Sequence, residues 1–146
     1  MFETILYPTD FSEVSMKGLN YIKEMKKSGA KKVIVMHAVD LRVAEALHGF
    51  LEHSKLEELQ WRMSKDAGPS LTTIEKELKE AGLEVETRIR LGVPLREILS
   101  CEKEEGVSVL IMGSHGLSNL QEIFLGSVSE KVIRKCKKPM LVIKRR

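Results

Sequence analysis

Glycine and serine residues are concentrated in one segment near the C-terminus, and their spacing could bind a phosphate. Gly113 and Gly116 come first, and Gly126 and Ser127 follow after nine further residues. Glycine has no Cβ, so it can adopt positive φ and lets an anion approach the backbone N–H groups closely. If a helix begins at Ser127, its free N–H groups and the positive end of its dipole face the same place. The segment therefore predicts a phosphate cradle that needs no lysine.

Each of these residues also has a purely structural interpretation. Gly113 could simply end a strand, and Ser127 could be an ordinary N-cap. The segment matches neither of the common phosphate loops, because no lysine precedes Ser127 and no Gly-x-Gly-x-x-Gly follows the first predicted strand. The combination of glycines and serines between a strand and a helix nevertheless favours the binding interpretation.

Other residues that could do chemistry are less specific. Asp10 follows the first predicted strand, where aspartate often only shapes a turn, and we expect it to contact the ligand as well. His37 lies within an apolar strand and is interpreted as a packed core histidine. His115 lies in the glycine-rich segment and could contact a nucleotide, but we assign it no catalytic role. His48 and His53 have no partner at metal-ligating spacing.

Short apolar segments alternate with longer amphipathic ones, and this pattern predicts the elements that would position these residues. The predicted strands are Thr4–Pro8, Lys32–Val39, Glu84–Arg90, Val107–Met112 and Pro139–Lys144. The predicted helices run from the turn at residues 9–12 to about Ser28, from Lys55 to Ala81, from Pro94 to about Gly106, and from about Ser127 to Lys135. Gly68-Pro69 could break or kink the second helix. For residues 40–53 the sequence predicts only a loop that contains a helical piece.

This alternation predicts the α/β class. Parallel strands joined by right-handed helical crossovers are the default for it, which gives a three-layer α/β/α sandwich. The 146 residues contain no repeat or linker, so we expect one domain over residues 1–146. Open sheets of this kind bind ligands at the carboxyl ends of the strands, where the strand order reverses. Asp10 and the glycine-rich segment both follow strands, so we expect them to meet at that edge.

The composition argues against several classes of partner. The net charge is +3, from 24 basic and 21 acidic residues, and the clusters of basic residues lie near the ends of predicted elements, so we expect no nucleic-acid partner. We find no signal-peptide pattern and no apolar run of membrane-spanning length, and we expect a cytoplasmic protein without a membrane partner. Cys101 and Cys136 lie far apart in the sequence and are interpreted as buried or half-buried free thiols.

Three segments of the chain resemble the universal stress protein family. The pattern Gly-x2-Gly-x9-Gly-Ser over residues 113–127 resembles the ATP-binding signature of that family. The first predicted strand and its turn, Ile5–Glu13, resemble the start of a universal stress protein, and Lys138–Lys144 resembles its end. The resemblance covers nearly the whole chain and is weakest over residues 40–70.

The resemblance implies a five-stranded parallel sheet in the order 3-2-1-4-5, of the adenine nucleotide alpha hydrolase type, with ATP and Mg²⁺ or Mn²⁺ bound between the first and fourth strands. The glycine-rich loop and the Ser127 hydroxyl would hold phosphates and ribose, Asp10 would lie by the ribose or the metal-phosphate cluster, and the backbone of Val39 would meet adenine. No metal ligand is assigned. The implied binding residues are Pro8, Thr9, Asp10, Val39, Gly113, Ser114, His115, Gly116, Leu117, Ser118, Asn119, Gly126, Ser127, Val128 and Ser129.

The function expected from this reading is that of an ATP-binding regulatory or stress-response module. The loop offers no convincing base and no arginine, so we expect hydrolysis that is slow or partner-dependent. Family members commonly dimerise through the last strand, which implies a homodimer through Met140–Ile143. The apolar residues between Gly116 and Gly126 either pack on the domain or meet an unknown protein partner.

Two other functions stay open. The chain could be a genuine ATPase or nucleotide-processing enzyme, or a structural dimer that binds no nucleotide. AMP or a cyclic nucleotide is an alternative to ATP, because the cradle alone does not determine how many phosphates the ligand carries.

Overall fold

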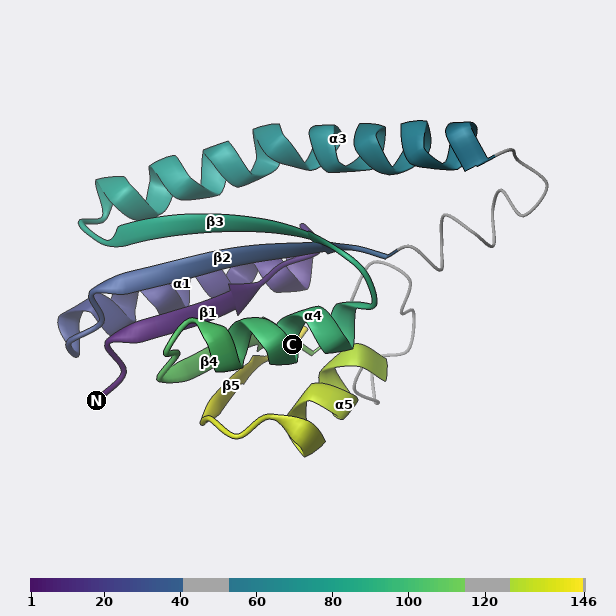
Figure 1. Ribbon diagram of the computed structural model, residues 1–146. Coiled ribbons are helices and arrows are strands. Elements are labelled where there is room, and N and C mark those ends of the chain that lie inside the picture. Colours follow the sequence, from purple (N-terminus) through teal and green to yellow (C-terminus); the bar gives the residue numbers. More distant parts are fainter. Residues whose placement is uncertain (41–52, 115–126, 146) are drawn as a thin grey trace.

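The computed structural model describes residues 1–40, 53–114 and 127–145 (Figure 1). Strands and helices alternate along these residues in the order that the sequence predicts. The elements are β1 (Thr4–Pro8), α1 (Glu13–Lys27), β2 (Lys32–Val39), α3 (His53–Glu80), β3 (Glu84–Leu91), α4 (Pro94–Glu104), β4 (Val109–Gly113), α5 (Ser127–Lys135) and β5 (Met140–Ile143).

The five strands form one parallel sheet in the order β3-β2-β1-β4-β5, which confirms the predicted fold. β1 is central, with Ile5 opposite Val33 of β2 on one side and opposite Val109 of β4 on the other. The chain moves outward from β1 to β3, and then returns to the other side of β1 through β4. The strand order therefore reverses between β1 and β4, and their carboxyl ends flank the switch point.

Helices cover both faces of this sheet, which gives the three predicted layers (Figure 1). Ile5 belongs to a core cluster with residues of α1 and α3, whereas its neighbour Leu6 belongs to a second cluster with residues of α4 and α5. Successive side chains of a strand point to opposite faces, so each strand supplies both clusters. Four of the five residues of β1 and all of β4 are buried, as expected for strands that are covered on both faces.

The start of α1 is fixed by the residues that precede the helix. The Ser12 hydroxyl accepts a hydrogen bond from the Ser15 N–H, and Glu13 places a negative charge in the first turn. The helix ends at Lys27 and is followed by Gly29, whose φ of 104° suits a residue without a Cβ. The predicted helix is confirmed, and its N-terminal turn faces the carboxyl ends of β1 and β4.

The possible break at Gly68-Pro69 does not occur, because α3 is continuous from His53 to Glu80. Proline within a helix removes one backbone hydrogen bond and costs about 3 kcal/mol. Burial of an apolar stripe on the same helix offsets this cost, at roughly 1.5–3 kcal/mol for each large side chain. The buried residues of this stripe are Ala67, Leu71, Ile74 and Leu78.

The cysteines are free thiols, as predicted: Cys101 is buried and Cys136 is half-buried. Burial raises the pKa of the Cys101 thiol to about 11, so it stays protonated and unreactive near neutral pH. Within the described ranges, no helix is both long enough and apolar enough to cross a membrane.

Candidate functional site

The turn after β1 is held by hydrogen bonds within the chain. The Thr9 N–H donates to the Met36 carbonyl at 2.8 Å, which extends the pairing of β1 with β2 by one residue. The Thr9 hydroxyl accepts from the Phe11 N–H at 3.0 Å and from the Ser15 hydroxyl at 2.7 Å, and the residue is only 5% exposed. Thr9 therefore shapes the turn beside the switch point. One donor to its hydroxyl, the Phe11 N–H, lies in the turn, and the other, the Ser15 hydroxyl, lies in α1.

Asp10 follows Thr9 and is half-buried. Its Oδ1 accepts a hydrogen bond from the Ser12 N–H at 3.0 Å, which is the geometry of an Asx turn. The structure thus shows the turn-forming role that aspartate often has at such a position. The same bond fixes the carboxylate at the carboxyl edge of the sheet, close to the start of α1.

The backbone of Ala38, which the sequence analysis did not name, lies beside the predicted contact Val39 at the end of β2. The Val39 carbonyl accepts the Gly92 N–H at 3.0 Å, so the backbone groups of Val39 point toward β3. Because the backbone groups of a strand alternate between its two neighbours, those of Ala38 point toward the β1 side. Pro8, which pairs with Met36, is the last residue of β1 in that ladder. The N–H and C=O of Ala38 therefore lie past the end of β1, at the switch point.

Gly113 ends β4, and its lack of a side chain has a packing role. A Cβ built on Gly113 would lie 3.1 Å from the Ser15 backbone nitrogen and 3.2 Å from Cγ1 of Val14. These contacts are tighter than ordinary van der Waals contacts. The glycine thus allows the first turn of α1 to lie directly on the end of β4, which brings the turn at Asp10 next to the start of the glycine-rich segment.

The serines beside Gly113 are also engaged within the chain. The Ser114 N–H donates to the Ile143 carbonyl at 2.8 Å, and Ser114 is 1% exposed. The Ser129 hydroxyl donates to the Gly113 carbonyl at 2.7 Å and is equally inaccessible, with 4% of the residue exposed. This bond ties the first turn of α5 to the end of β4. Ser129, one of the implied binding residues, therefore uses its hydroxyl proton inside the protein, whereas Ser127 in the same turn is exposed.

The first turn of α5 lies at the same edge of the sheet. The nine-residue helix begins at Ser127, and the N–H groups of its first turn have no partner within the helix. Val128 packs against the core cluster of α4 and α5, so it can offer a ligand only its backbone. The helix start and its dipole are suited to an anion.

The described site residues therefore come together at one edge. The residues that the structure places there are Pro8, Thr9, Asp10, Gly113, Ser114, Ser127, Val128 and Ser129, with Val39 directed toward β3. The remaining predicted site residues lie outside the described part of the chain, namely His115, Gly116, Leu117, Ser118, Asn119 and Gly126. The apolar loop that could meet a protein partner lies outside it too.

A metal site would need several histidine, cysteine, aspartate or glutamate side chains close together. Among the residues that the structure describes, no group of three or more histidine, cysteine, aspartate or glutamate side chains could hold a metal ion. Among the predicted site residues that the structure describes, Asp10 alone carries a carboxylate.

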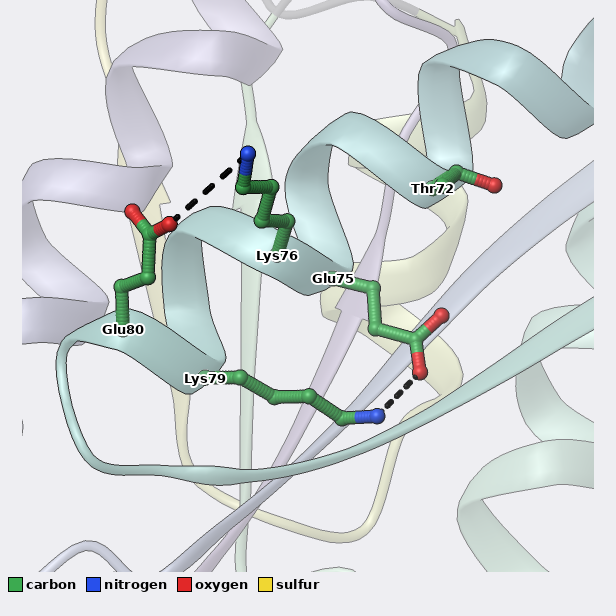
Figure 2. A pocket seen from close by; sticks show the side chains of 5 residues that line it. All are labelled: Thr72, Glu75, Lys76, Lys79 and Glu80. Atoms are coloured by element: carbon green, nitrogen blue, oxygen red, sulfur yellow. Dashed lines mark hydrogen bonds and ion pairs between the residues drawn. The ribbon is translucent and has the colours of Figure 1, made fainter.

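A depression elsewhere on the surface is not a good alternative site (Figure 2). Residues of α3 line it, and their charges are paired with one another: Lys79 with Glu75 at 2.6 Å, and Lys76 with Glu80 at 4.0 Å. It lies near the end of α3, four residues before β3 begins at Glu84, and so toward the amino ends of the strands. Neither its chemistry nor its place in the fold suggests a ligand.

Comparisons with known proteins agree with the fold. The model of the universal stress protein family matches residues 1–144. Universal stress protein MJ0577 of Methanocaldococcus jannaschii is 40% identical, over 100% of this chain and 97% of the relative. Universal stress protein YxiE of Bacillus subtilis is 32% identical, over 99% of this chain and 100% of the relative. A solved structure of MJ0577 has a TM-score of 0.90 to this chain at 41% identity, and the match covers 100% and 98% of the two chains.

Proposed function

The chain belongs to the universal stress protein family, and on that premise we propose that it binds ATP at the carboxyl edge of the sheet and acts as a cytoplasmic, nucleotide-dependent regulatory module. One observation carries the proposal. Gly113 lets the first turn of α1 lie on the end of β4, and Ser129 ties the first turn of α5 to the same residue. Two helix starts thereby converge on the switch point of the sheet.

The described residues fit an adenine nucleotide at this place. The N–H and C=O of Ala38 can hydrogen-bond the edge of adenine, because they lie past the end of β1. Asp10 can accept from ribose hydroxyls or face a phosphate-bound cation. The N–H groups at the start of α5 and the Ser127 hydroxyl can hold phosphate oxygens. Mg²⁺ or Mn²⁺ would neutralise part of the triphosphate charge, since the segment from Gly113 to Ser129 contains no lysine or arginine.

Two solved neighbours support adenine nucleotides as the class of ligand to test. A universal stress protein that is 22% identical to this chain was solved in complex with cAMP, and one from Archaeoglobus fulgidus that is 20% identical was solved in complex with dAMP. At these identities the likeness shows a shared fold alone. The preference for ATP over a monophosphate therefore rests on the resemblance of the Gly-x2-Gly-x9-Gly-Ser spacing to the ATP-binding signature of the family, and titrations with ATP, AMP and cAMP test it.

We propose slow or partner-dependent hydrolysis rather than rapid turnover. Transfer of a phosphoryl group needs an oriented water and cationic groups over the phosphate. The Asp10 carboxylate already accepts from the Ser12 N–H, and the Thr9 and Ser129 hydroxyls are bonded inside the chain. Groups that are already bonded within the chain are poorly placed to activate a water, so we expect the chain to act through its nucleotide-bound state.

Binding is tested on the protein purified without added nucleotide. The nucleotide released by denaturation is identified by anion exchange, and the stripped protein is titrated with Mg-ATP, AMP and cAMP by calorimetry. We expect ATP to bind and Gly126→Val to weaken it by at least about tenfold, because a β-branched side chain would stand where the motif brings phosphate to the backbone. Gly68→Val, on α3 with no atom within 4 Å of its Cβ position, should bind as the wild type does. Failure to bind any adenine nucleotide would favour the structural dimer, and rapid steady-state hydrolysis would favour an ATPase.

We further propose a homodimer through β5. This strand is one edge of the sheet, and its apolar residue Leu141 is 37% exposed. An apolar edge strand with unpaired backbone groups readily pairs with another chain. Light scattering at micromolar concentration is expected to give the mass of a dimer, and Leu141→Lys the mass of a monomer. A monomeric wild type would refute the proposal.

A further inference from the structure

His37 is the one polar side chain in an otherwise apolar part of β2. Val33, Ile34, Val35 and Met36 precede it and are at most 1% exposed, whereas His37 is half-buried near the carboxyl end of the strand. An apolar residue would fill this position at least as well if packing were its whole purpose. The imidazole must therefore be explained by the contacts that it makes.

The first contact is a hydrogen bond to the turn after β1. The Nδ1 atom of His37 lies 2.8 Å from the carbonyl oxygen of Thr9. A carbonyl can only accept, so Nδ1 carries the proton and donates it. This bond comes from a strand that is 28 residues distant in the sequence, and it holds the backbone immediately before Asp10.

The second contact is with the residue immediately after Asp10. The rings of Phe11 and His37 stack with their centroids 4.6 Å apart and their planes tilted by 32°. Phe11 has a φ of 64°, and it is the only residue other than glycine with positive φ in the described part of the chain. This conformation is unfavourable for a bulky residue and persists where surrounding contacts hold it. The stack is one such contact.

We infer that His37 is a positioning residue of the nucleotide site, which sets the place of Asp10 by holding the residues on both sides of it. The inference rests on the proposed function, because it requires the nucleotide to lie at this edge of the sheet. The hydrogen bond from His37 holds the Thr9 carbonyl, directly after the end of β1. The stack on His37 holds Phe11, the residue of positive φ shortly before the start of α1. Between them, Asp10 keeps one backbone conformation before any ligand arrives, and this preorganisation favours binding.

Two substitutions separate the hydrogen bond from the stack. His37→Phe keeps a stacking ring and removes the donor, whereas His37→Asn places an amide N–H close to the position of Nδ1 and removes the ring. We expect His37→Phe to raise the Kd for Mg-ATP about five- to tenfold, because the hydrogen bond acts on the carbonyl directly before Asp10, and His37→Asn to raise it less, about two- to threefold, because only the stack on Phe11 is lost. Thermal unfolding should give the opposite order, with His37→Phe at least as stable as His37→Asn, because the larger apolar ring buries more surface.

Opposite orders of affinity and stability are the signature of positioning. If His37→Phe binds Mg-ATP as tightly as the wild type, the inference is refuted. It is also refuted if affinity falls in proportion to stability in both variants, since His37 would then only support the fold. A wild-type protein that binds no adenine nucleotide would overturn the proposed function, and this inference with it.

Discussion

Replacing Gly113 with valine is expected to lower the free energy of unfolding by about 3 kcal/mol. The new Cβ would lie 3.1 Å from the backbone nitrogen of Ser15 and 3.2 Å from Val14, and the two methyl groups would need still more room. The backbone of α1 cannot move away as the end of a flexible side chain could. Overpacking of this kind typically costs 1–3 kcal/mol, and the good strand propensity of valine offsets little of it. Denaturant unfolding monitored by circular dichroism measures the change.

Two glycine-to-alanine variants serve as controls for this result. Gly113→Ala adds the Cβ without the methyl groups, so we expect a loss of about 1 kcal/mol. Gly68→Ala should instead stabilise the protein by about 0.5–1 kcal/mol, because Gly68 lies within α3 with nothing within 4 Å of its Cβ position. If Gly113→Val unfolds at the same denaturant concentration as the wild type, Gly113 has no packing role and its use is confined to the ligand.

The sequence predicted the fold well because the signals for its elements are local. Apolar runs placed β1 and β2 with the bounds observed, and Pro94 and Gly29 marked the start and the end of helices. β4 begins two residues later than predicted, at Val109. The residue before it, Ser108, hydrogen-bonds Thr4 through both its N–H and its hydroxyl, and so belongs to the entry of the strand. Because this contact joins residues that are far apart in the sequence, no local sequence pattern predicts it.

The site was predictable in position but not in orientation. Spacing placed Asp10 and Gly113 at one edge of the sheet, yet the partners of Thr9 and Ser129 depend on contacts that only the folded chain creates. The choice between Ala38 and Val39 depends on the register of β2 against β1 and β3. The backbone groups of successive residues in a strand point alternately toward its two neighbours. Which residues point toward which neighbour depends on the pairing with the adjacent strands.

The role of Glu102 could not be predicted from local sequence patterns either. It lies on α4 and is only 6% exposed, although glutamate is almost never fully buried without a partner. Its Oε1 accepts the backbone N–H groups of Lys137 and Lys138, both at 2.8 Å. These residues connect α5 to β5, 35 and 36 positions further along the chain. One carboxylate thus fixes the connection that delivers the edge strand β5.

Replacing Glu102 with alanine is therefore expected to lower the free energy of unfolding by about 2 kcal/mol, because two backbone donors lose a charged acceptor at once. Glu102→Gln keeps an oxygen at the same place and should lose about 1 kcal/mol or less. Glu24→Ala is a matched control on α1, since the Glu24 side chain is 69% exposed and its ion pair with Lys27 is worth no more than about 0.5 kcal/mol. Denaturant unfolding measures all three, and faster amide exchange in β5 should accompany the loss in Glu102→Ala alone. Equal stability of Glu102→Ala and Glu24→Ala would show that water replaces the carboxylate without cost, and that β5 is held by its pairing with β4.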